Sequence, residues 1–69
     1  MKLKVGQLYQ SNNKSYLFYI KNIDKDNNCV YVGCIGVSKI WTYHEWSYKN
    51  VIDYAKNGSD VLISDVKEG

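Results

Sequence analysis

Residues 15–35 read SYLFYIKNIDKDNNCVYVGCI, two β-prone runs on either side of a short polar segment. The first run, Ser15–Ile23, is rich in aromatic and β-branched residues, and the second, Cys29–Ile35, alternates valine with other residue types. Residues 24–28 between them are Asp, Asn and one Lys, and Asp and Asn readily adopt the left-handed conformations that tight turns need. The pattern predicts an antiparallel β-hairpin.

Turn-forming residues divide the rest of the chain into further short elements. The expected elements are a strand over Leu3–Tyr9 that bends at Gly6, a turn over 11–14, a turn over 36–39, a strand over Ile40–His44, a helix over Val51–Asn57 and a closing strand over Val61–Ile63. Ser47 or Asn50 can cap the helix, with Asp53 as the capping-box acid after Asn50, and Gly58 can end it. We expect the apolar side of the helix, with Ile52, to pack over an open end of the strands.

Short strands at close spacing, with no crossover long enough to join parallel strands, predict a mainly β fold. Gly33 and Gly36 permit the strong coiling that a small barrel requires. We therefore expect a small antiparallel SH3-like barrel of about five strands with one short C-terminal helix. It should be a single domain over residues 1–69, with a polar tail from residue 65.

Composition restricts the classes of partner. The chain has 69 residues, a net charge of +2, nine Lys and no Arg, so it lacks the planar side chain that reads guanine edges and clamps phosphates. No run approaches the roughly 20 apolar residues of a membrane span, and the first residues alternate Lys with apolar residues, unlike a signal peptide. We expect a cytoplasmic protein without a membrane partner.

The two cysteines do not form a recognisable site. Cys29 and Cys34 are five residues apart, so on one strand they face opposite sides at a separation of roughly 16 Å, too far for a disulfide. Together with the distant His44 they supply too few ligands for a metal. Residues 24–28 imitate half of a calcium loop, but its later positions hold Cys29 and Ile35 in place of Gly and Glu. We expect no metal and no cofactor.

Catalysis is also not indicated. His44 could act as a base oriented by Glu45, yet neighbours on a strand point to opposite faces. We therefore predict that the chain is not an enzyme.

The N-terminal third carries a resemblance. Val5-Gly6-Gln7-Leu8-Tyr9, then Asn12-Asn13, then Tyr16-Leu17-Phe18-Tyr19-Ile20 resemble the start of small SH3-like proteins encoded by phages and prophages of AT-rich bacteria. Such proteins are often accessory or host-takeover factors that bind a host protein or nucleic acid. The resemblance implies a binding role, with no particular target and no site residues.

Aromatic residues are the candidate binding site, because the chain has ten of them. The residues expected to face the core are Phe18, Ile20, Val30, Val32 and Cys34. Tyr19 and Tyr31 then face outward, while Trp41 and Tyr43 share one face of the following strand. Such a surface is typical of interaction hot spots, but small coiled sheets also half-bury tyrosines as ordinary packing.

Two functions follow from different classes. The first is a small non-catalytic protein-binding module, a phage-encoded inhibitor or modulator of a host protein. Its site would be Tyr19, Tyr31, Trp41 and Tyr43. The second is a single-stranded nucleic-acid-binding protein in which the same rings stack on bases and Lys21 and Lys39 contact phosphates. The lack of Arg and the low net charge favour the first.

Overall fold

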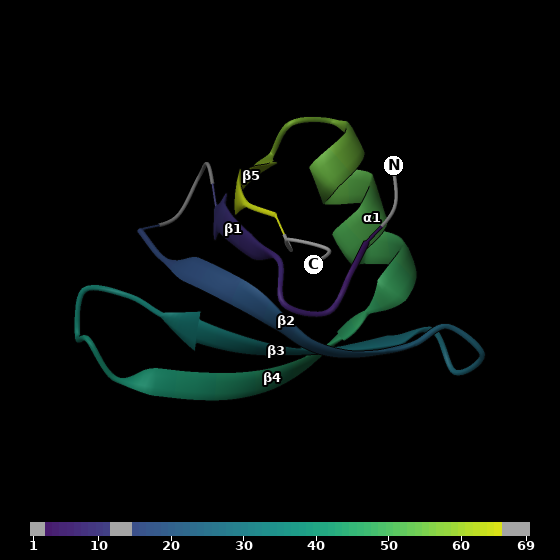
Figure 1. The fold of residues 1–69 in the computed structure, drawn as a ribbon, viewed down its shortest axis with the longest axis horizontal. Coiled ribbons are helices and arrows are strands. Elements are labelled where there is room, and N and C mark those ends of the chain that lie inside the picture. Colours follow the sequence, from purple (N-terminus) through teal and green to yellow (C-terminus); the bar gives the residue numbers. More distant parts are fainter. Residues whose placement is uncertain (1–2, 12–14, 66–69) are drawn as a thin grey trace.

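The computed structural model describes residues 3–11 and 15–65, which form one antiparallel sheet and one helix (Figure 1). The elements are β1 (Leu8–Ser11), β2 (Leu17–Asp24), β3 (Cys29–Ile35), β4 (Trp41–Ser47), α1 (Tyr48–Lys56) and β5 (Asp60–Ser64). The five strands lie in the order β4-β3-β2-β1-β5. The predicted class, mainly β with about five antiparallel strands and one short C-terminal helix, is confirmed. Closure into a barrel is not shown, because β4 and β5 are the two ends of this order.

Two strand boundaries differ from the prediction by three residues or more. β1 begins at Leu8, because Val5 and Gly6 form a turn in which Gly6 adopts a φ of 95° that an extended strand cannot contain. The predicted strand over Leu3–Tyr9 is therefore wrong in its first half. β4 continues to Ser47, three residues beyond the predicted end, because its pairing with β3 extends to Cys29 opposite Ser47. Most of the predicted turn at 11–14 lies outside the described residues.

A bulge in β2 sets which side chains reach the core. Ile20 pairs with Val32, but the next pair is Asn22 with Tyr31, so Lys21 is an extra residue in β2. After the bulge Ile23 returns to the inner face opposite Val30. Strict alternation of side chains along β2 would instead place Ile23 on the outer face.

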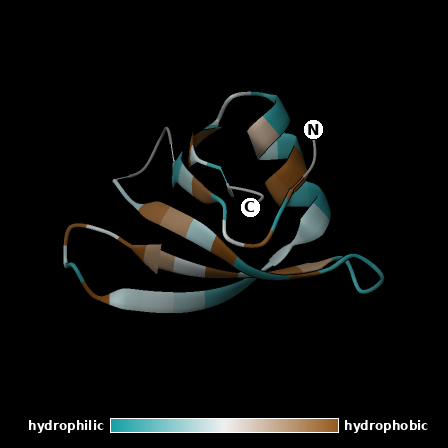
Figure 2. Ribbon diagram, in the orientation of Figure 1, coloured by the Kyte–Doolittle hydropathy of each residue, from teal (hydrophilic) through white to brown (hydrophobic). Residues whose placement is uncertain are grey.

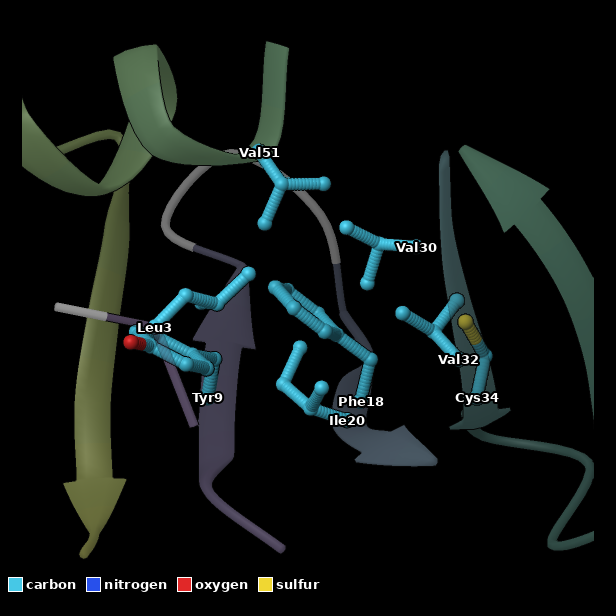
Figure 3. Close-up of a cluster of buried hydrophobic side chains, with 8 residues drawn as sticks. All are labelled: Leu3, Tyr9, Phe18, Ile20, Val30, Val32, Cys34 and Val51. Carbon is cyan, nitrogen blue, oxygen red and sulfur yellow. The ribbon is translucent and has the colours of Figure 1, made fainter. Parts of the chain in front are cut away.

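The core lies on the inner face of the sheet, beneath α1 (Figure 3). Its buried members are Leu3, Tyr9, Phe18, Ile20, Val30, Val32, Cys34 and Val51. Figure 2 shows the same pattern in hydropathy, with hydrophobic residues along β2 and β3 and a hydrophilic turn between them. All five side chains predicted to face inward do so. In α1 the buried side chain is Val51, whereas Ile52 is only half-buried against the cluster.

The helix starts at a cap that is built partly by a distant turn. The Ser47 hydroxyl accepts a hydrogen bond from the Asn50 backbone N–H at 3.4 Å, which makes Ser47 the N-cap and rules out Asn50 and its capping box with Asp53. Asn28 adds a donor to the Ser47 hydroxyl at 3.0 Å and accepts the Lys49 N–H at 2.9 Å. α1 therefore begins three residues earlier than predicted, and Gly58, with a φ of 83°, follows its end as expected.

A buried glutamine joins both ends of the described chain. The side-chain oxygen of Gln7 accepts hydrogen bonds from the Lys4 N–H at 2.8 Å and from the Tyr9 hydroxyl at 3.0 Å. Its side-chain nitrogen donates to Asp65 at 3.0 Å. Burial raises the pKa of Tyr9, and the carboxylates of Asp65 and Asp60 raise it further, so the hydroxyl remains a donor.

Candidate functional site

The outer face of β2, β3 and β4, opposite the core, carries the four predicted aromatic residues. Strand register places Tyr19, Gly33 and Tyr43 side by side across the three strands. Trp41 lies opposite Ile35 and Tyr31 lies opposite Glu45 on the same face. We refer to Tyr19, Tyr31, Trp41 and Tyr43 together as the aromatic face.

Gly33 is the residue on which the Tyr19 ring packs, and Trp41 and Tyr43 lie beside that ring. A Cβ atom at this position would lie 2.8 Å from Cζ of Tyr19, so the Tyr19 ring rests directly on the glycine backbone. Tyr19 meets the edge of Trp41 at a ring-centroid distance of 5.2 Å, and its hydroxyl lies near Tyr43. Burial, and then Tyr43, raise the pKa of Tyr19. The absence of a side chain at Gly33 thus allows a compact ring cluster.

Exposure differs among the rings. Tyr19 is half-buried, whereas Trp41 is 44% and Tyr43 is 61% exposed. The cluster therefore combines the packed ring of Tyr19 with two accessible rings, an arrangement suited to contact with another molecule.

Tyr31 belongs to a second, polar cluster on the same face. The Cys29 thiol donates to Oε1 of Glu45 at 3.1 Å, and the Tyr31 hydroxyl lies beside both groups. The pKa of Tyr31 is raised to about 12, chiefly by the hydrogen bond with Cys29 and then by the charges of Cys29 and Glu45. Burial and Glu45 raise the pKa of Cys29, so its thiol is protonated at neutral pH and is a poor nucleophile.

The two candidate lysines occupy different positions. Nζ of Lys21 lies 4.2 Å from the centroid of the Tyr43 ring, a cation–π distance. Lys39 is in the turn between β3 and β4, with a φ of 60°. The structure brings Lys21 against the aromatic face, and it places Lys39 at the end of that face.

The other reactive side chains are separated. Cys34 lies in the core and Cys29 on the opposite side of β3, and both thiols are free, as the odd spacing predicts. His44 faces the inner side, where Nε2 is 3.0 Å from the Thr42 hydroxyl and the ring stacks on Trp46, so it points away from Glu45. Within residues 3–11 and 15–65, no group of three or more His, Cys, Asp or Glu side chains is arranged to hold a metal. The described helix is too short and too polar to cross a membrane.

Two hollows on the inner side were not anticipated from the sequence. One, of about 530 Å³, lies between the end of β4, α1 and the start of β5. The other, of about 320 Å³, lies along the inner face of β4 beside Thr42 and His44. Tyr16 and Trp46 line both. Polar residues at the inner positions of β4 are the sequence signal that this part of the inner face is open.

Comparison with protein-family models, curated proteins and solved structures found no match for the chain.

Proposed function

We propose that the chain is a small non-catalytic protein-binding module that contacts its partner through the aromatic face. The proposed partner is a host protein that a phage-encoded inhibitor or modulator would bind in the host cytoplasm. The resemblance of the N-terminal third to small phage proteins supports this choice of partner.

The observation that carries the proposal is the ring cluster on Gly33. Tyr19 is packed on the glycine and against the edge of Trp41, while Trp41 and Tyr43 are exposed beside it. Rigid, amphipathic rings lose little conformational entropy on binding, and tyrosine and tryptophan are enriched among residues that dominate interface energies. The core does not require these rings, because it is complete on the inner face.

The charges around the rings also favour a protein partner. Lys21 lies at Tyr43, and Glu45 lies beside Tyr31, so charges of both signs lie next to the rings. A surface that follows a phosphate backbone is generally positive along its length. The single-stranded nucleic-acid alternative is supported by one contact, that of Lys21 over the Tyr43 ring, where a base could stack next to a cation.

The test compares accessible rings on the two sides of the molecule. Wild-type protein, Trp41→Ala/Tyr43→Ala and the control Tyr54→Ala would each be used to capture partners from a host lysate, with and without nuclease. Tyr54 is 51% exposed but belongs to α1, so its loss should leave binding unchanged. The double variant should weaken binding by about 2 kcal/mol or more, roughly thirtyfold.

Salt dependence separates the two candidate functions. Affinity for a captured protein should change little with salt, whereas affinity for a labelled single-stranded oligonucleotide would fall steeply as counterions compete. The proposal fails if the folded double variant captures the partner as well as the wild type does. The nucleic-acid function replaces it if nuclease abolishes capture and the oligonucleotide binds with a steep salt slope.

A further inference from the structure

β4 is an edge strand with little of the usual protection against pairing (Figure 1), since Glu45 is its one formally charged residue. Its seven residues pair with β3 without a register shift, and none of them is Pro or Lys. Edge strands commonly carry Pro, Lys or a bulge that prevents another strand from adding to them. The opposite edge, β5, is shorter, begins with Asp60 and has an irregular register with β1. β4 is therefore the edge better suited to accept a strand.

The hydrogen-bonding groups of the free edge can be assigned. The Tyr48 N–H donates to the Asn28 carbonyl at 3.1 Å, so these residues form a hydrogen-bonded pair that continues the β3–β4 register. Hydrogen-bonded and non-hydrogen-bonded pairs alternate along an antiparallel ladder. The residues of β4 whose N–H and C=O groups point away from β3 are consequently Trp41, Tyr43, Glu45 and Ser47.

We propose that two copies of this chain associate by antiparallel pairing of β4 with β4 about a two-fold axis at His44. His44 is the midpoint of Trp41–Ser47, so this register pairs all seven residues of the strand. Tyr43 then lies opposite Glu45 of the second copy, and Trp41 lies opposite Ser47. Every outward N–H and C=O of the strand gains a partner.

Charge complementarity selects this register. Lys21 sits over Tyr43, so this register brings the second copy's Glu45 opposite the ring on which Lys21 lies. Glu45 would turn from the Cys29 thiol toward Lys21 of the other copy, and symmetry repeats this contact. An axis at Glu45 would place the two Glu45 carboxylates opposite each other, which is unfavourable. An axis at Tyr43 would leave Trp46 and Ser47 without partners in β4.

The paired sheet would make the aromatic face continuous across both copies. Trp41 and Tyr43 project from the outer face and are not covered by pairing along the edge. The association thus goes beyond the proposed function and can be tested without the partner protein.

A cysteine on the two-fold axis tests the register directly. Opposite residues in a non-hydrogen-bonded pair have Cα atoms about 4.5 Å apart, within the range of about 4.4–6.8 Å that a disulfide spans. His44→Cys should therefore cross-link two copies under mild oxidation. The control Thr42→Cys lies on the same face but roughly 13 Å from its symmetry mate, so it should not cross-link. The native cysteines are buried and remain in place in both variants.

Charge reversal tests the proposed contact between Lys21 and Glu45 of the second copy. In analytical ultracentrifugation across a wide concentration range, the wild type should change from the mass of one 8.0 kDa chain to that of two. Glu45→Lys and Lys21→Glu should each weaken association about tenfold, because a repulsion replaces both symmetric contacts. The double variant Lys21→Glu/Glu45→Lys should restore it, which a loss of the Cys29–Glu45 contact alone would not do.

Three results would overturn the proposal. They are a wild-type chain that keeps the mass of one copy at every concentration, a His44→Cys variant that cross-links no better than Thr42→Cys, and a charge-swapped double variant that associates no more tightly than the single variants. Thermal unfolding of each variant establishes that it is folded; His44 is exposed, so its replacement should not affect the core.

Discussion

Replacing the buried glutamine that joins the two ends of the chain, Gln7→Leu, should lower the free energy of unfolding by about 2–3 kcal/mol. Gln7 is only 3% exposed, and Leu fills most of its volume while removing its hydrogen bonds. The largest loss is at Tyr9, whose side chain is 1% exposed and whose hydroxyl would lose its acceptor inside the core. A buried donor without a partner costs about 1–3 kcal/mol.

The hydrogen bond from Gln7 to Asp65 accounts for the rest of the expected loss in unfolding free energy. A hydrogen bond to a charged group is worth about 1.5–3 kcal/mol, but Asp65 is exposed and can turn toward water, so we count only part of that value. A chain of this length has a total stability of about 3–10 kcal/mol, which makes the loss a large fraction of the whole. The midpoint of thermal unfolding should fall by roughly 10–20 °C.

Urea unfolding followed by tryptophan fluorescence measures this loss, because Trp46 packs on Phe18 and reports on the core. Tyr9→Phe is the matched control, since it removes the donor whose acceptor Gln7→Leu deletes. The double variant Gln7→Leu/Tyr9→Phe should be more stable than the sum of the single effects predicts, by about 1 kcal/mol. Strict additivity, or a Gln7→Leu variant within about 0.5 kcal/mol of the wild type, would refute the network.

Three further predictions concern the outer face and the helix. The pKa of Tyr31 rises from 10.0 to about 12 on folding, so the phenol stabilises the fold fully below pH 10.0 and this contribution is lost as the pH rises to about 12. Tyr31→Phe should therefore flatten the fall in unfolding free energy across that interval, as measured by denaturation at several pH values. Gly33→Ala should displace the Tyr19 ring, lower stability by about 1 kcal/mol and change the near-UV circular dichroism, and an unchanged spectrum would contradict the ring packing. Val51→Asp should cost about 3–5 kcal/mol because it buries an unpaired charge, and Ile52→Asp should cost clearly less in the same urea titration.

Much of the fold could be predicted because the deciding features are local. The polar segment between residues 24 and 28 and the alternation in Cys29–Ile35 define the central hairpin, and the observed β3 has the predicted bounds. The start of α1 could not be predicted in this way. Its cap depends on Asn28, 19 residues before Ser47, and nothing near the helix in sequence indicates that contact. The bend at Gly6 was predicted, but the strand assigned to the residues before it was wrong for a similar reason, since a hydrogen bond from the Gly6 N–H to the Ile20 carbonyl holds the turn against β2.

The candidate site could be predicted as a set of residues but not as an arrangement. Alternation places Tyr19, Tyr31, Trp41 and Tyr43 on one face, and the structure brings them there. Alternation does not reveal that Tyr19 rests on Gly33, because cross-strand neighbours depend on register. Alternation along β2 places Lys21 on the same side as Tyr19, but its position over the Tyr43 ring, two strands away, depends on the register of β2, β3 and β4.

The shared cap at Asn28 has a consequence for the order of events in folding. A helix of nine residues is too short to be stable in isolation, where about 12–15 residues are needed even for favourable sequences. Two of the groups that bond the first turn of α1, the Asn28 amide and the Ser47 hydroxyl, meet only when β4 has paired with β3 along its full length. Formation of the helix is therefore coupled to completion of the β3–β4 pairing. The turn before β3 and the first turn of α1 should fold and unfold as one cooperative unit although they are distant in sequence.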